Sequence, residues 1–201
     1  MRIACATNSA SSRICAGIDA FRSAREVALR AQALLIVALQ GEALATKGNP
    51  LIDRLRMEFP AGFDALSPLE AEFLRTAAPE EQLLINFVWR YEALQVLAWV
   101  LELVETLPEP VHVCDAEALV RVVQSGARIN TRSRPRLRQP AEILDVLDEH
   151  FCLHWLAVQA RQKGMSPPNG IHEGIIRERH HALNWLASFL RAAWDDVQTP
   201  T

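Results

Sequence analysis

The fold is decided by the stretch FVWRYEALQVLAWVL, residues 87–101, which has the pattern of a helix that is apolar almost all round. At about 3.6 residues per turn, its apolar side chains form two stripes on different sides of the helix. The first stripe holds Phe87, Tyr91, Leu94, Ala98 and Leu101, and the second holds Trp89, Ala93, Val96, Val100 and Leu103. Because a helix that is apolar on more than one face must be enclosed by other elements, we predict a buried central helix near residues 80–106.

Helical patterns flank this stretch on both sides. Apolar residues recur at helical spacing in residues 21–40, 140–163 and 171–191, and shorter helices are expected at 51–59, 67–74 and 116–124. No segment alternates apolar and polar residues for long enough to form a convincing strand. We therefore predict an all-α fold, a single compact bundle of about seven helices over residues 18–201, preceded by a flexible extension at residues 1–17.

The composition is that of an ordinary globular protein. Of the 201 residues, 50% are hydrophobic and 22% are charged, and the formal net charge is −3. This balance predicts one substantial core and excludes a disordered chain. Domains that bind nucleic acid normally carry a strong basic excess, so nucleic acid is not an expected partner.

Neither export nor a membrane span is expected from the sequence. Residues 1–18 lack the continuous apolar run of a secretion signal. The best span, residues 82–101, holds Arg90 and Glu92 at its centre, where each charge would cost roughly 2.5–3.5 kcal/mol. The widely spaced cysteines contain no Cys-x-x-Cys pair, so they indicate no zinc site. We expect a cytoplasmic protein with reduced thiols, no membrane contact, no metal and no cofactor.

The unusual feature is a set of charges at positions where apolar residues are expected. Arg90 and Glu92 are the only charges in the quoted stretch, and Glu178 and Arg179 fall inside the apolar arc of the last helix. A buried charge without a partner costs several kcal/mol. We therefore predict that at least one of Glu178 and Arg179 forms an ion pair with Arg90 or Glu92.

The central charges are not expected to share one neighbour. Arg90 and Glu92 point about 200° apart on an ideal helix, so the second of them should find its partner on another element. The candidates are Asp195 and Asp196, or the arginines Arg22, Arg25 and Arg30. The resulting cluster has two interpretations: it fixes the register of the helices, or it lines a pocket and handles a polar ligand.

A local basic run interrupts this acidic protein. Residues 126–140 hold Arg128, Arg132, Arg134, Arg136 and Arg138 with no acidic residue among them. Our main interpretation is a solvated loop whose arginines reach carboxylates on neighbouring helices. The alternative is an anion contact, or a nucleic-acid contact, made by Arg132, Arg134 and Arg136.

Histidines offer weaker candidates for chemistry. His150 and His154 lie four residues apart on a helix, but no third metal ligand is indicated, so partly buried structural histidines are expected. His180 and His181 diverge by about 100° on a helix and cannot readily share a metal. His112 and Cys114 lie in a short connector without supporting residues, and no reactive pair is expected there.

Rare residues recur in an order that resembles one protein family. They are Val88-Trp89-Arg90-Tyr91-Glu92-Ala93-Leu94, Trp99, Pro108, Cys114-Asp115, Glu178-Arg179-His180-His181-Ala182-Leu183-Asn184-Trp185 and Trp194-Asp195-Asp196-Val197. This combination resembles domain of unknown function family 4272, over roughly residues 22–201. The resemblance implies a largely bacterial helical protein and carries no activity. The chain departs from the family pattern at Gln159 and at Thr199-Pro200-Thr201.

Two functions of different classes follow from these features. The leading hypothesis is a non-enzymatic soluble protein that binds an unknown protein or a small polar ligand, with the charge cluster as a structural brace. The alternative is a hydrolase-like or metal-assisted enzyme that uses Glu178, His180 or His181, and Asp195 or Asp196 near a pocket. A homo-oligomer is compatible with either hypothesis.

Overall fold

The fold was analysed in a computed structural model that describes residues 21–130 and 135–201. Within these ranges the chain is all helix and turn, and no strand occurs. The predicted all-α fold class is therefore confirmed. The elements are α2 (Ala24–Ala45), α3 (Ile52–Glu58), α4 (Pro60–Asp64), α5 (Pro68–Arg75), α6 (Glu81–Val88), α7 (Arg90–Val100), α8 (Ala116–Asn130), α9 (Pro140–Gln162), η1 (Pro168–Gly170), α10 (Glu173–Leu186), η2 (Phe189–Arg191) and η3 (Trp194–Asp196).

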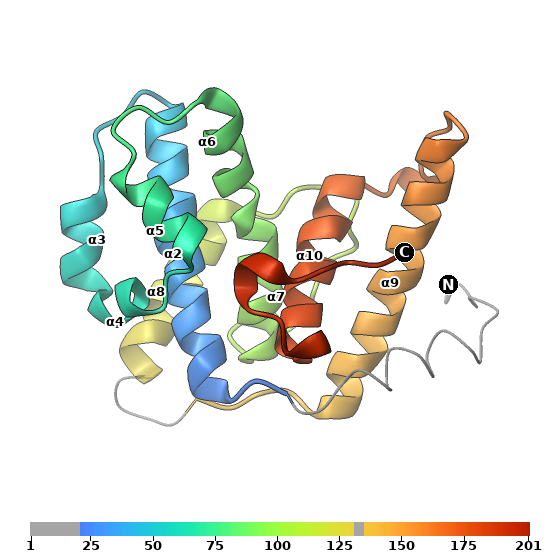
Figure 1. Ribbon diagram of the computed structural model, residues 1–201. Helices are drawn as coiled ribbons and strands as arrows, with labels where there is room; N and C mark the ends of the chain where they lie inside the picture. Colours follow the sequence, from blue (N-terminus) through green and yellow to red (C-terminus); the bar gives the residue numbers. More distant parts are fainter. Residues whose placement is uncertain (1–20, 131–134) are drawn as a thin grey trace.

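The helices pack side by side, with α7 in the middle of the molecule (Figure 1). Helix α7 lies between α2 and α10, and α9 covers the outer side of α10. The short helices α3, α4 and α5 pack on the other side of α2, while α8 contacts both α2 and α7. The main hydrophobic core is built largely from residues of α2, α7 and α10.

Helix α7 is the buried element that its sequence predicts. Ala93, Leu94, Val96, Leu97, Ala98 and Val100 are all completely buried. Other helices cover α7 on more than one face, which explains why its sequence lacks a polar stripe.

The predicted central helix of residues 80–106 is wrong in its extent. It is divided at Trp89 into α6 and α7, and the Glu92 amide donates to the Trp89 carbonyl at 3.0 Å, a tighter turn than that of an α-helix. It also ends at Val100, because Glu102 adopts a left-handed φ of 59°, and the amides of Glu102 and Leu103 donate back to the carbonyls of Trp99 and Ala98. The Arg138 side chain adds hydrogen bonds to the carbonyls of Trp99, Val104 and Glu105.

Helix α2 is a second enclosed helix. A capping box closes its first turn, with the Ser23 hydroxyl accepting from the Glu26 amide and the Glu26 carboxylate accepting from the Ser23 amide. By length and composition α2 could cross a membrane, but 67% of the relevant window is buried inside the protein. The buried core helix of a soluble protein meets the same criterion, so α2 is weak evidence for a membrane span.

Other helix ends also differ from those expected. Helix α2 continues to Ala45, past the predicted end at residue 40. Helix α8 continues to Asn130, past the predicted end at residue 124. Helix α10 ends at Leu186 instead of residue 191, because Ser188, Leu190 and Arg191 adopt positive φ angles of 50°, 54° and 54° that a right-handed helix excludes. The turn after α10 sends the C-terminal segment, residues 192–201, back across the helices (Figure 1).

Gly62 allows α4 to approach α2 closely. A Cβ atom at this position would lie 2.8 Å from Gln32 Cβ and 2.8 Å from Ile36 Cδ1, both on α2. We expect Gly62→Ala to lower the free energy of unfolding by about 1–3 kcal/mol, because the extra methyl group overpacks this contact. Urea denaturation measures the change. The control is Ala61→Ser at an exposed position of the same helix, for which a change below about 0.5 kcal/mol is expected; equal effects of the two substitutions would contradict the prediction.

Candidate functional site

Two ion pairs join α7 to α10 in the interior. Arg90 Nη1 donates to Glu178 Oε2 at 2.8 Å, and Arg179 Nε donates to Glu92 Oε2 at 3.0 Å. The prediction that charges on these helices pair is confirmed. The expectation that Arg90 and Glu92 need partners on different elements was wrong. Arg90 begins α7 beside the break, and its side chain is 23% exposed, so it reaches Glu178 from the edge of the contact.

The inner pair is fully satisfied. Arg179 is completely buried and also donates to the Pro108 carbonyl at 2.6 Å and to Gln95 Oε1 at 2.9 Å. The other oxygen of Glu92 accepts from the Cys114 amide at 2.7 Å. Burial, and then the Glu92 carboxylate, raise the pKa of the Cys114 thiol to about 12. Cys114 therefore stays protonated and is no nucleophile at neutral pH.

A third buried ion pair joins α2 to α5. Arg30 Nη2 donates to Glu70 Oε2, and the two side chains are 5% and 2% exposed. Glu70 also completes the predicted capping box, because its carboxylate accepts from the Ser67 amide at 2.8 Å. The sequence signal for this pair was the position of Arg30, which falls between Val27 and Leu34 on the buried face of α2.

The Trp194 ring contacts the arginines of two of these ion pairs. The guanidinium carbons of Arg30 and Arg90 lie 4.9 Å and 5.9 Å from the centre of its ring, both within the range of cation–π attraction. The rings of His181 and Trp185 meet it edge-on at 4.6 Å and 5.5 Å. The C-terminal segment is thus anchored by one aromatic side chain that contacts α2, α7 and α10 together.

Several buried polar atoms around Trp194 have no hydrogen-bond partner. They are Arg30 Nε, Glu70 Oε1, Arg90 Nε, His181 Nε2 and Trp194 Nε1. Polar atoms in protein interiors are nearly always paired, so a group of unpaired atoms in one place marks a region with unused hydrogen-bonding capacity. This region borders a pocket.

The pocket has a volume of about 690 Å³ and opens between the start of α2, the turn before α5 and the C-terminal segment. Its lining residues are Glu26, Leu29, Arg30, Asp64, Ala65, Ser67, Pro68, Leu69, Trp185, Ala193, Trp194, Asp195 and Asp196. Asp195 Oδ2 accepts from the Leu69 amide at 3.0 Å and so fixes the C-terminal wall against α5. The pocket is therefore assembled from segments that are far apart in the sequence.

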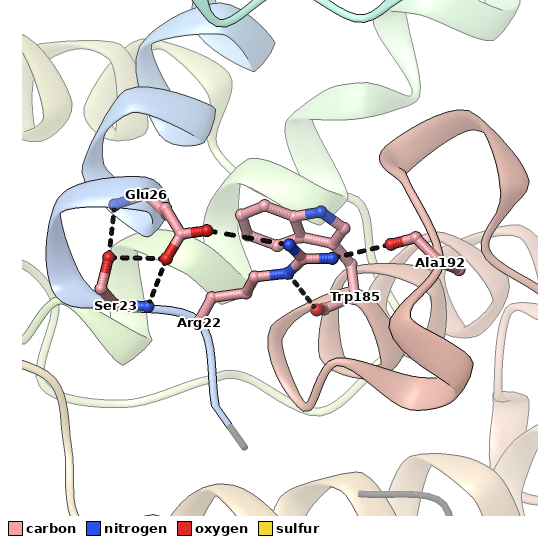
Figure 2. A network of polar contacts seen from close by, with 5 residues as sticks. All are labelled: Arg22, Ser23, Glu26, Trp185 and Ala192. Carbon is pink, nitrogen blue, oxygen red and sulfur yellow. Dashed lines mark hydrogen bonds and ion pairs between the residues drawn. The ribbon is translucent and has the colours of Figure 1, made fainter. Parts of the chain in front are cut away.

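Arg22 fastens the same wall from the side of α2 (Figure 2). Its guanidinium lies 5.1 Å from the centre of the Trp185 ring and donates to the carbonyls of Trp185 at 3.3 Å and Ala192 at 2.7 Å. Glu26 lies beside it, held by Ser23. The first turn of α2 therefore positions a carboxylate at the pocket and holds the chain just before Trp194.

The structure separates the predicted site residues into two groups. Asp195 and Asp196 line the pocket, whereas Arg90, Glu92, Glu178 and Arg179 form the buried ion pairs. Arg132 and Arg134 lie outside the described residues, and Arg136 is exposed. The sequence interpretation missed Trp185, Asp64 and the Arg30–Glu70 pair as parts of one site, because nothing local in the sequence relates them.

The histidines face in different directions. His180 points toward α9, where its Nδ1 lies 3.0 Å from His154 Nδ1, and His150 Nδ1 lies 2.8 Å from the Val146 carbonyl. His181 packs on Trp194 instead. Within residues 21–130 and 135–201, no three histidine, cysteine or acidic side chains are arranged to hold a metal ion. The set proposed for an enzyme does not converge on the pocket.

Comparison with known proteins gives a family and no activity. The model of a family described as "Domain of unknown function (DUF4272)" matches residues 9–197 of the chain. This confirms the family resemblance inferred from the tryptophans and from the charges at positions where apolar residues are expected. No curated protein and no solved structure matches.

The inner ion pair can be tested by removing one partner. We expect Arg179→Met to lower the free energy of unfolding by about 3–5 kcal/mol, because Glu92 is left charged and buried. The double variant Arg179→Met with Glu92→Gln should recover part of this loss. Urea denaturation gives both values. The matched control is Arg121→Met, which breaks an exposed pair with Glu117 and should cost less than about 1 kcal/mol; a loss at Arg179 no larger than this would refute a stabilising role.

Acid should destabilise the protein through its buried histidines. Burial lowers the pKa of His180 to about 3 and that of His150 to about 4, below the value of about 6.5 in an unfolded chain. Between pH 6.5 and 4 the unfolded chain therefore binds protons that the folded chain excludes, and the free energy of unfolding falls as the pH falls.

His180→Asn isolates this effect. The plot of unfolding free energy against pH, measured between pH 6 and 5, should be shallower by about 1.2 kcal/mol per pH unit than that of the unmodified protein. The exposed His112 is the control, and His112→Asn should leave the slope unchanged. Equal slopes for all three proteins would mean that His180 does not contribute to acid sensitivity.

Proposed function

The chain belongs to the DUF4272 family, whose description names no activity, and on its geometry we propose that the protein is a non-enzymatic binding protein for a small polar ligand. The observation that carries the proposal is the pocket of about 690 Å³ beside unpaired polar atoms of Arg30 and Trp194. Ligand sites are typically concave, largely apolar and roughly 300–1,000 Å³ in volume, with a few polar groups that orient the ligand. This pocket has those properties.

The buried ion pairs support a structural role for the charge cluster. Glu178 is held by Arg90 at 2.8 Å and is also 3.7 Å from Arg177, so its carboxylate is already engaged. A general acid or base must come within hydrogen-bonding reach of its substrate. Glu178, His180 and His181 are absent from the pocket lining. These contacts favour a brace over a catalytic group.

We also propose that the protein is cytoplasmic and binds neither membranes nor nucleic acid. The free thiol of Cys114 suits the reducing cytoplasm, and the burial of α2 argues against a membrane contact. The net charge of −3 disfavours nucleic acid as a general partner. A small molecule is the ligand that the size of the pocket fits.

Filling the pocket provides the test. Ala193 lies in the lining and is exposed, so Ala193→Trp should occupy the space without disturbing the core. A library of small amines, alcohols, amides and carboxylates is screened against the unmodified protein by saturation-transfer NMR. We expect compounds that bind the unmodified protein and lose their signal with Ala193→Trp.

The control places the same bulky side chain elsewhere. Ala141→Trp is on an exposed face of α9 and should retain the signals of all the compounds that bind. If no compound in the library depended on Ala193, the pocket would not be the binding site and the proposed function would fail.

A further inference from the structure

The outer part of the pocket is negatively charged. Glu26, Asp64, Asp195 and Asp196 line it, and all but the partly buried Asp195 are exposed. The hydrogen bonds from Ser23 lower the pKa of Glu26, so this carboxylate is ionised at neutral pH. Among the described lining residues Arg30 is the positive one, and its charge is already paired with Glu70. Arg22 lies 3.7 Å from Glu26 and offsets its charge, so the exposed negative charge of the opening is chiefly that of Asp64 and Asp196. A cation is therefore the ion that this opening attracts.

Two buried lining residues of the pocket carry unpaired hydrogen-bond donors. Arg30 and Trp194 both line the pocket and are each 4% exposed. Arg30 Nε and Trp194 Nε1 are buried N–H groups without an acceptor. Because an indole N–H can only donate, the group that satisfies Trp194 must be an acceptor. The lining also contains the apolar residues Leu29, Pro68 and Trp185.

These features describe the two ends of one ligand. On the basis of the proposed function, we propose that the ligand is a small organic amine with a neutral hydrogen-bond acceptor, such as a hydroxyl or an amide, at its other end. The ammonium group meets the carboxylates of Asp64 and Asp196, and the acceptor faces the N–H groups of Arg30 and Trp194. A carboxylate at the inner end is disfavoured, because Glu70 already neutralises Arg30 and Asp195 lies nearby.

Three compounds with the same six-carbon chain separate the contribution of the ammonium group from that of the hydroxyl group. Aminohexanol carries both groups, hexylamine carries the ammonium alone, and hexanol carries the hydroxyl alone. Dissociation constants are measured by tryptophan fluorescence and calorimetry on the full chain. We expect aminohexanol to bind most tightly, by about tenfold over each of the other two compounds.

Variants assign each end of the ligand to its residues. The double variant Asp64→Asn with Asp196→Asn should weaken the two amines by about tenfold and leave hexanol unchanged. Trp194→Phe keeps the ring but removes the N–H, and it should reduce the affinity for aminohexanol to that for hexylamine. Calorimetry provides the readout for this variant, and its circular dichroism spectrum checks that it is folded. Asp145→Asn, an exposed change on α9, should leave all three affinities unaltered.

The outcomes distinguish the ligand class from the pocket itself. Hexanol binding as tightly as aminohexanol, with both sensitive to Ala193→Trp, would overturn the cationic ligand and leave the proposed function in place. If none of the three compounds bound while other members of the library depended on Ala193, the inferred ligand would be refuted alone. A library without any compound that depends on Ala193 would refute the inference and the proposed function together.

Discussion

The structure depends on the burial of Arg179 against Glu92. A completely buried guanidinium is tolerated only when its charge and its N–H groups are all satisfied, and here Glu92, Gln95 and the Pro108 carbonyl do so together. These partners come from α7 and from the connector after it, so α10 can lie in only one register against them. One ion pair thereby fixes where every other side chain of α10 points.

That register has consequences on the two other faces of α10. On one side His180 meets His154 of α9, where burial lowers the pKa of His180 to about 3. On another side His181 supports Trp194, which also contacts Arg30 and Arg90. The ion pairs fix the positions of the helices. Because Trp194 packs against side chains from these helices, the position of the C-terminal segment depends on them. The wall of the pocket therefore depends on contacts made in the core.

The sequence predicted the fold through periodicity, and it predicted the α7–α10 contact through charges on apolar faces. It could not predict the break at Trp89 or the end of α7, because α7 ends in a left-handed turn at Glu102, where no glycine or asparagine signals it. Nor could it predict the pairing of Arg30 with Glu70, since a residue in a capping box is usually exposed. The pocket has no local signature, because its walls come from residues near 26, 65 and 195.

The C-terminal segment is the part of the site most dependent on side-chain contacts. It follows Ser188, Leu190 and Arg191, all in left-handed backbone conformations that disfavour residues other than glycine, each by roughly 1–3 kcal/mol. The contacts that offset this strain are the ring packing of Trp194 and the hydrogen bonds of Arg22, Asn184 and Asp195 with Ala192, Gln198 and Leu69. Asp195 also lines the pocket, and Arg22 holds the lining residue Trp185 through its carbonyl. A ligand held between the first turn of α2 and η3 would add to the same set of contacts, so binding and the docking of this segment must stabilise each other.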